Sequence, residues 1–465
     1  PASVEPLERM ARDGALGEAR LHALWTLEGL DALDTDLILA ALDDEEAGVR
    51  ESAVVLAERR LFTGVSGEDS TKGSGETDLN HRLMQALLEM EEDVSERVRC
   101  QLLLTLGYSE DPQAADVRNR ILLQHLEDPW FQVASLSAVS VDASRRLEQA
   151  MKELSDRETP GRRSYFRQIG SLMAAGGGSD ETGRMLTLTA GGREAWWATA
   201  LLEGLADQLE RQGGAGAAIR GHEQALIELF FDAVDQALRR PILRLLTLSG
   251  IPDSLRDQTV QKAVAIVNRT EQPDTMQAEG EEPDAVQTDA MRPNAMQTDT
   301  MRPDRHSDTT RSAAIRLLSL VQPKAHTELF ISLVDPSEPV SVQLAALQAL
   351  VQIPGSEIGD AIMERWDLMT PLVRDGAVDV MIADMDRIAM LLEAVGEGRV
   401  QVSTIGWGRR VILMRDLGGD EVALQLRDRA RELLSRDPDL RREVINRYLA
   451  AMDAHQDLAS PERGR

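Results

Sequence analysis

The chain has 465 residues, of which 42% are hydrophobic and only 3% aromatic, and its formal net charge is −28. The acidic excess argues against a nucleic-acid partner, because a phosphate-binding surface needs a stripe of basic residues. The single cysteine, Cys100, leaves no intrachain disulfide and no thiolate metal site, so we expect it to be a small buried hydrophobe.

The hydrophobic residues are mainly Leu, Ala, Val, Ile and Met, which suit closely stacked helices better than a sheet sandwich. Alternating β-branched runs between turn residues are absent, and no apolar run has the length of a membrane span. These features predict an all-α fold with almost no strand.

Residues 18–60 are the first clear unit, and they read as helix, turn, helix, acidic turn and helix. Leu21, Leu24 and Trp25 form one apolar stripe, and Asp34 is placed to cap the second helix. Helix pairs this short cannot bury their stripes alone, so they need neighbours stacked on both sides. The pattern recurs along the chain and predicts an α-solenoid of degenerate helical hairpins.

Further helices are expected at steps of roughly 15–20 residues, as in helical hairpin arrays. Three of them are predicted to begin at Asp128-Pro129, Thr159-Pro160 and Asp335-Pro336, because proline in the first turn loses no helical hydrogen bond. Residues 62–76 are rich in Gly and Ser and are predicted to be a loop.

Residues 270–307 break the helical pattern. They contain three tandem decamers, TMQAEGEEPD, AVQTDAMRPN and AMQTDTMRPD, with a proline every ten residues and no apolar stripe. Such a segment cannot bury enough surface to offset its ordering entropy. We therefore predict a repeat block at 1–269, a disordered insertion at 270–307, a second repeat block with a terminal cap at 308–452, and a linker to a further C-terminal domain at 453–465.

Two stretches resemble HEAT repeats, namely DDEEAGVRESAV at 43–54 and EEDVSERVRCQL at 91–102. In HEAT repeats the acidic residue of one turn and the arginine of the Val-Arg pair commonly stack as a ladder along the array. The resemblance implies ladder positions at Arg50 and Arg99, and the Val-Arg pair has decayed elsewhere in the chain. It also implies that the blocks are HEAT/armadillo-like.

A second resemblance concerns residues 19–44 and the closing SPERGR at 460–465. They look like the start and end of the HEAT region of large bacterial proteins that join a glucose-dehydrogenase-like β-propeller to a C-terminal c-type cytochrome domain. The resemblance implies a periplasmic, cell-surface or otherwise exported protein. Any c-type haem would lie in the parent protein outside these residues, because the haem attachment motif CxxCH is absent here.

No residue qualifies for a catalytic, cofactor-binding or metal-binding role. None of the seven histidines has a second histidine at ligand spacing, and no nucleophile stands near a histidine in a recognisable motif. The acidic clusters at 43–46 and 89–93 lack the spacing of a calcium loop, so we interpret them as solvated turns and helix N-caps. The segment itself is predicted not to be an enzyme.

Trp196 and Trp197 are the candidate partner-binding residues. Adjacent residues on a helix point about 100° apart, so one is expected in the core and the other at the surface. An exposed tryptophan is a strong interface anchor.

The sequence thus predicts a non-catalytic scaffold with a protein partner, which spaces or docks the redox domains of a larger exported cytochrome-containing protein. Its oligomeric state stays open. One alternative is an accessory array resembling the HEAT-like bilin lyases that handle a tetrapyrrole, although the low aromatic content counts against such a pocket. A second alternative is a free-standing protein-binding adaptor.

Overall fold

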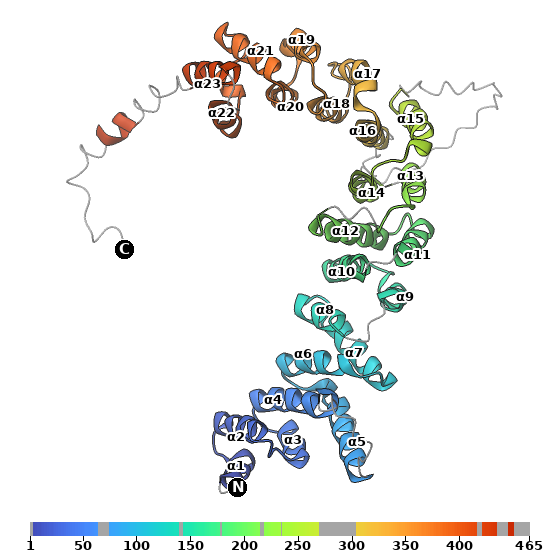
Figure 1. Cartoon of the computed structure of the whole chain (residues 1–465), viewed down its shortest axis with the longest axis vertical. Coiled ribbons are helices and arrows are strands. Elements are labelled where there is room, and N and C mark those ends of the chain that lie inside the picture. Colours follow the sequence, from blue (N-terminus) through green and yellow to red (C-terminus); the bar gives the residue numbers. More distant parts are fainter. Residues whose placement is uncertain are drawn as a thin grey trace, which may run out of the picture. The chain divides into compact units, whose positions relative to one another are not determined.

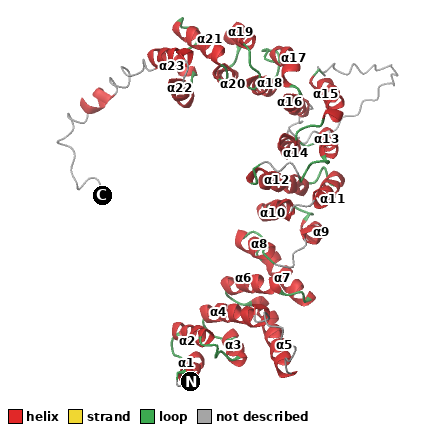
Figure 2. Ribbon diagram, viewed as in Figure 1, coloured by secondary structure: helices red, strands yellow, loops and turns green. Residues whose placement is uncertain are grey.

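The computed structural model describes residues 3–63, 74–138, 143–176, 179–213, 218–233, 235–268, 304–415, 421–434 and 445–450. Within these ranges the regular structure is helical and contains no strand (Figure 2). No described helix has the length and apolar character that a membrane crossing requires. The predicted all-α fold is confirmed.

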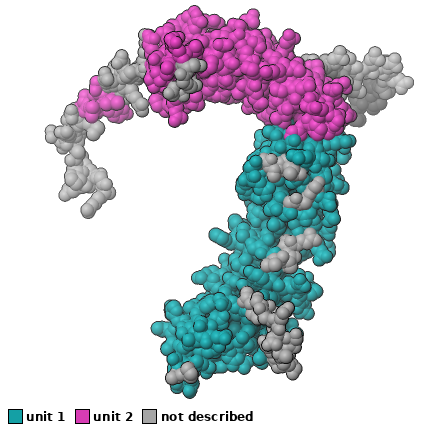
Figure 3. Space-filling view, in the orientation of Figure 1, with its two compact units in different colours: residues 1–249 teal, residues 250–465 magenta. Residues whose placement is uncertain are grey.

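The chain divides into two compact units, residues 1–249 and 250–465 (Figure 3). Unit 1 holds the helices α1 (Val4–Asp13), α2 (Gly17–Gly29), α3 (Thr35–Leu42), α4 (Ala47–Glu58), α5 (Ser74–Glu89), α6 (Glu96–Thr105), α7 (Pro112–Gln124), α8 (Pro129–Leu136), α9 (Ala143–Leu154), α10 (Pro160–Gly176), α11 (Ser179–Gly191), α12 (Trp196–Arg211), α13 (Glu223–Asp232) and α14 (Gln236–Ser249).

Unit 2 holds α15 (Asp253–Val267), α16 (Asp304–Val321), α17 (Thr327–Ser332), α18 (Val340–Val351), α19 (Ser356–Arg365), α20 (Pro371–Ile382), α21 (Met385–Gly396), α22 (Trp407–Met414) and α23 (Glu421–Leu434). Short 3-10 or π turns extend several of the helices in both units, such as Arg59–Thr63 after α4.

Helices in unit 1 form two layers (Figure 1). The even-numbered helices α2 to α14 pack side by side in chain order, and odd-numbered neighbours such as α1, α3, α5 and α7 form the second layer. Unit 2 repeats this arrangement, with α16, α18 and α20 in one layer and α17, α19, α21 and α23 in the other. Each hairpin therefore buries its stripe against the hairpins before and after it, and the predicted α-solenoid is confirmed.

Of the helix starts predicted at Asp34 and at the three proline pairs, all but one are observed with a side-chain cap. The side chains of Asp34 and Asp128 accept hydrogen bonds from the backbone at the starts of α3 and α8, and Thr159 does the same at α10. The expectation for Asp335-Pro336 is wrong. Asp335 accepts hydrogen bonds from Ser337 and forms a turn, and α18 begins at Val340.

The segment predicted to be disordered mostly lies outside the described residues, as do residues 453–465. The helices that flank it, α15 and α16, pack against each other as one hairpin. α16 begins at Asp304, a few residues earlier than predicted, and α5 likewise begins at Ser74 within the predicted loop. Cys100 is half-buried, so it is less enclosed than expected.

Glycine allows α10 and α12 to cross in near contact. A Cβ added at Gly170 would lie 2.1 Å from the carbonyl oxygen of Leu201, and one at Gly204 would lie 1.8 Å from that of Arg167. Both separations are far below van der Waals contact. The Ser171 hydroxyl also donates to the Gly204 carbonyl at 2.9 Å. The two backbones therefore touch at this crossing, which only glycine permits.

This crossing predicts that G204A destabilises the chain, because the new methyl group forces α10 and α12 apart. We expect a loss of about 1–3 kcal/mol, the usual cost of overpacking. Gly48 on α4 has open space around its Cα, so G48A should leave stability unchanged or raise it by at most about 1 kcal/mol. Urea unfolding of the full chain compares the two variants, and equal stability would contradict the close crossing.

Candidate protein-interaction surface

A buried arginine links the turn of one hairpin to that of the next. Arg20 of α2 donates through Nη1 to the Gly14 carbonyl at 2.7 Å, which caps the end of α1. Its Nε and Nη2 donate to the two carboxylate oxygens of Asp44, in the following hairpin, at 2.7 and 2.6 Å. The same side chain thus ends one helix and ties two repeats together.

Arg50 repeats this arrangement one hairpin later. Its Nη1 donates to the Asp44 carbonyl at 2.7 Å, and its Nε and Nη2 donate to Asp93 at 2.7 and 2.9 Å. Burial alone would raise the pKa of the Asp93 carboxyl, but the bonds from Arg50 and from the Ser95 N–H outweigh it and hold that pKa below its usual value. The predicted Arg50 ladder position is confirmed.

Two of the acidic residues interpreted as solvated turns are therefore ladder members. Asp44 and Asp93 have nearly buried side chains, with 10% and 8% exposure. Each also accepts a backbone hydrogen bond at the start of the next helix, from Glu46 and Ser95. The N-caps of these two helices are Glu46 and Ser95, and neither helix has a side-chain cap. Both parts of the interpretation, solvated turn and helix N-cap, are therefore wrong for Asp44 and Asp93.

The ladder changes at the turn between α7 and α8. Leu126 occupies the position of the ladder aspartate, and Gln132 occupies that of the arginine, because its amide donates to the Leu126 carbonyl at 2.6 Å. Arg99 therefore has no aspartate at the ladder position of the following turn, where Asp128 instead caps α8, and its Nε donates to His125 Nε2 at 3.1 Å. His125 stacks on Phe131 with ring centroids 4.2 Å apart.

A further ladder contact occurs in unit 2. In unit 2, Arg311 donates to both carboxylate oxygens of Glu338 at 2.7 and 2.9 Å and through Nε to the Val267 carbonyl at 3.0 Å. No Val-Arg pair marks this position, because residue 310 is threonine. The Val-Arg pair has decayed here as expected, but the ladder contact itself persists without a preceding valine.

Exposed apolar side chains recur where even-numbered helices begin, next to the turn inside each hairpin. We call these residues the apolar turn edge. In unit 1 they are Leu16, Val94 and Trp130, and in unit 2 they are Val340, Leu372 and Trp407. Trp130 and Trp407 are 75% and 66% exposed. Scattered exposed apolar residues are ordinary, but their recurrence within two residues of the start of an even-numbered helix is not explained by core packing.

The two predicted tryptophans lie at the start of α12, beside Phe166. Trp197 belongs to the core, and its ring lies close against Gly192. Trp196 is half-buried and meets Phe166 edge to face at 5.2 Å. Its buried Nε1–H finds no hydrogen-bond partner among the described residues. Trp196 lies at the start of an even-numbered helix but is not exposed enough to belong to the apolar turn edge, and contact of either tryptophan with a partner stays a prediction.

A groove of about 470 Å³ lies on the even-numbered layer of unit 1. It forms because α8 has only 8 residues whereas α10 has 17, so α8 leaves part of α10 uncovered. Its lining comes from α8, α10 and α12: Val133, Leu136, Ser137, Ser164, Arg167, Gln168, Ser171, Leu172, Ala175, Asp207, Gln208 and Arg211.

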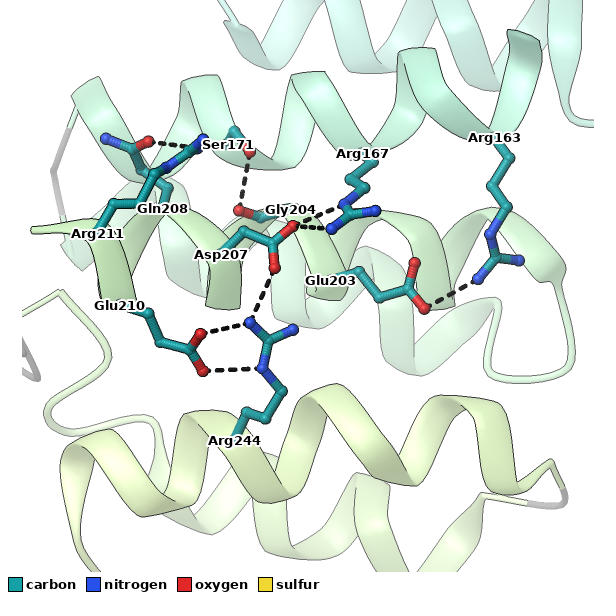
Figure 4. A network of polar contacts seen from close by, with 10 residues as sticks. All are labelled: Arg163, Arg167, Ser171, Glu203, Gly204, Asp207, Gln208, Glu210, Arg211 and Arg244. Carbon is teal, nitrogen blue, oxygen red and sulfur yellow. Dashed lines mark hydrogen bonds and ion pairs between the residues drawn. The ribbon is translucent and has the colours of Figure 1, made fainter. Parts of the chain in front are cut away.

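Ion pairs cross this layer from helix to helix (Figure 4). Arg163 of α10 pairs with Glu203 of α12 at 3.0 Å, and Arg167 pairs with Asp207 at 2.5 Å. From α14, Arg244 reaches Asp207 at 2.8 Å and Glu210 at 2.6 Å. These pairs are partly exposed, so each adds little stability, but together they fix the side chains along the groove.

The described residues hold no cluster of three or more His, Cys, Asp and Glu side chains that could bind a metal ion. The ladder carboxylates are instead saturated by arginines and backbone N–H groups. What the described surface offers is apolar contact and fixed charge, the chemistry of protein recognition.

No model of a known protein family matches the chain, and no curated protein matches it. Among known structures it is similar to the C-terminal fragment of the Chaetomium thermophilum cohesin loader SCC2, with 12% identity over 94% of this chain, and a TM-score of 0.33. The chain spans 35% of the length of that fragment. It is also similar to a homology model of the full-length AP-3 complex in an intermediate open conformation, with 11% identity, 98% of this chain and 75% of that chain covered, and a TM-score of 0.31. Scores this low give no basis for transferring a function.

The ladder predicts that D93A opens the contact between α4 and α6, because Arg50 loses its carboxylate while its side chain stays mostly buried. We expect a loss of about 2–3 kcal/mol, near the lower end for a broken buried pair. Amide hydrogen exchange in α4 and α6 of the full chain should then quicken by roughly 30- to 150-fold. The matched control is R97A, which removes an arginine that is 80% exposed and pairs with Glu51, and it should change little. Equal effects would show that the ladder adds no stability.

The hydrogen bond from Arg99 to His125 predicts that the chain is sensitive to acid. Burial and the neighbouring Arg99 cation lower the pKa of His125. The unfolded chain then binds more protons as the pH falls below about 6.5, so the stability that neutral His125 allows is lost in that direction. The H125Q variant can still accept from Arg99 but cannot titrate. Its thermal midpoint should fall less than that of the wild type between pH 7.5 and pH 5.5, whereas H22Q, at an exposed histidine, should follow the wild type. An H125Q profile parallel to the wild type would contradict this role.

Proposed function

We propose that the chain is a non-catalytic helical-repeat scaffold that binds protein partners along its apolar turn edge. The observation that carries the proposal is the exposure of Trp130 and Trp407 at equivalent helix starts of the two units. Tryptophan contributes more to protein interfaces than most residues, because its large ring loses much hydration and little conformational entropy. A solenoid offers the same turn in every repeat, which provides an extended row of contact points.

The turn edge is held rigidly enough to serve as a contact surface. Trp130 lies in the first turn of α8, which Asp128 caps by accepting from the Trp130 N–H at 2.8 Å. The next residue, Phe131, is buried and stacks on His125. The indole therefore projects from a fixed backbone, so a partner would lose little free energy in ordering it.

The finer part of the proposal is that the scaffold spaces or docks the redox domains of a larger exported c-type cytochrome-containing protein. Its support is the resemblance of residues 19–44 and 460–465 described above. The reading frame beyond Arg465 tests it. A CxxCH motif within the next ~50 residues would fit c-type haem attachment. A stop codon or an unrelated domain there would remove the redox context and leave the scaffold proposal standing alone.

Site-specific photocross-linking tests docking at the turn edge. With p-benzoylphenylalanine in place of Trp130 or Trp407, the full chain in its native cells should give a discrete cross-linked protein that mass spectrometry identifies. Tyr108 is the matched control, because it is an aromatic residue, 47% exposed, at the other end of α6 from Val94. Cross-linking at position 108 with the same yield, or none at 130 and 407, would contradict docking at this edge.

A further inference from the structure

The groove between α8 and α12 differs in charge from the chain that carries it. The whole chain has a net charge of −28. Around the groove lie the arginines Arg163, Arg167, Arg211 and Arg244 and the carboxylates Glu203, Asp207 and Glu210 (Figure 4), and Arg163 also pairs with Glu158. This part of an acidic protein therefore holds no acidic excess.

The carboxylates of this network are already occupied by arginines. Asp207 lies between Arg167 and Arg244, and Glu210 accepts two hydrogen bonds from Arg244 at 2.8 and 2.6 Å. Burial would raise the pKa of Asp207, but the bonds from these two arginines outweigh it and keep the carboxyl ionised. The negative charge of the groove is thus neutralised within the fold.

Arg211 differs from these arginines in its hydrogen-bond partner. It lies at the end of α12, and its Nη2 donates to the amide oxygen of Gln208 at 2.7 Å. Gln208 is uncharged, and no carboxylate among the described residues pairs with this guanidinium. Because Arg211 is exposed at the mouth of the groove, it can form a bidentate ion pair with an incoming carboxylate.

The groove also has an apolar part. It consists of Val133 and Leu136 from α8 with Leu172 and Ala175 from α10, and Val133 is 48% exposed. The surrounding elements are helices whose backbone groups are bonded within each helix, so the groove offers no strand edge for an extended peptide. An amphipathic helix is the segment that recognises such a surface through side chains alone.

We propose that this groove binds an acidic amphipathic helix of a protein partner. Apolar side chains of that helix pack on Val133 and Leu172, and one of its carboxylates pairs with Arg211. The inference rests on the proposed function in treating the chain as a protein-binding array, but it uses a different surface from the apolar turn edge. The expected preference for an acidic ligand is opposite to the one that the net charge would produce.

Three fluorescent helical peptides test the groove on the full chain. All carry leucine at i, i+3, i+4 and i+7, and their remaining positions are glutamate, glutamine or lysine. At 150 mM salt the glutamate peptide should bind tightest by fluorescence anisotropy, about three- to tenfold tighter than the glutamine peptide. The lysine peptide should bind weakest. A lysine peptide that binds best, or a glutamate peptide that fails to bind at millimolar concentration, overturns the proposal.

Variants then locate the site. R211Q should abolish the preference for glutamate over glutamine, whereas R184Q, at an exposed arginine of α11, should keep it. V133S should weaken the glutamate and glutamine peptides by a similar factor, because it removes apolar contact common to both. Unchanged preference in R211Q would contradict the assignment, and circular dichroism checks that each variant is folded. The W130A variant separates the two surfaces, since it removes a side chain of the apolar turn edge and should leave the glutamate preference of the groove intact.

Discussion

Buried arginines at the hairpin turns are the interaction on which the stacking of this chain depends. A helix that ends inside a protein leaves its last carbonyls without partners, and a buried carbonyl without a hydrogen bond is costly. In this chain the first or second turn of the following helix supplies the donor. The donors and their carbonyls are Arg20 with Gly14, Arg50 with Asp44, Arg99 with Asp93, Gln132 with Leu126 and Arg239 with Ala233. In each pair the two residues are six positions apart, so the sequence around each turn alone determines whether the carbonyl has this donor.

Some of these arginines also bind a carboxylate in the turn of the next hairpin, besides the carbonyl that they cap. Where it is present, as in Asp44, Asp93 and Glu338, the arginine becomes bidentate and joins neighbouring hairpins. Where this carboxylate is absent, the arginine or glutamine still donates to the turn carbonyl of its own hairpin. The contact with the next repeat is then made by other groups. At α7 and α8 this group is a neutral histidine, and between α10 and α12 the contact is a direct one between backbones through glycine. The repeats therefore differ in how they join, and the groove beside α8 is a consequence of that variation.

The sequence predicted the helices and their stacking because both follow from local patterns, namely the apolar stripe, the caps and the need of short hairpins for neighbours. The Arg50–Asp93 pair could be predicted from its motif. Arg20 and Arg311 were not predicted, because Ala19 and Thr310 precede them and neither arginine belongs to a Val-Arg pair. Each nevertheless donates to a backbone carbonyl at the end of a preceding helix. The sequence signal for Arg20 and Gln132 is an arginine or glutamine six residues after the turn residue whose carbonyl accepts its hydrogen bond.

The exposed residues were harder to predict than the buried ones. Trp130 follows a capping aspartate and a proline, and the pattern alone does not say whether it turns inward. Trp196 and Trp197 stood out as a pair, yet both lie against Phe166 and only one is half-exposed. The groove depends on the spacing between α8, α10 and α12, which is set by tertiary contacts. Its sequence signals were the brevity of α8 and the glycines inside α10 and α12.

Native-state hydrogen exchange along the full chain tests the central claim most directly, namely that the turn arginines and close crossings set the strength of each joint between repeats. The account predicts slow exchange in α4 and α6, which the Arg50–Asp93 pair joins, and in α10 and α12, which meet through glycine. It predicts faster exchange in α8, where the ladder lacks its aspartate. Uniform protection across these helices, or the slowest exchange in α8, would contradict it.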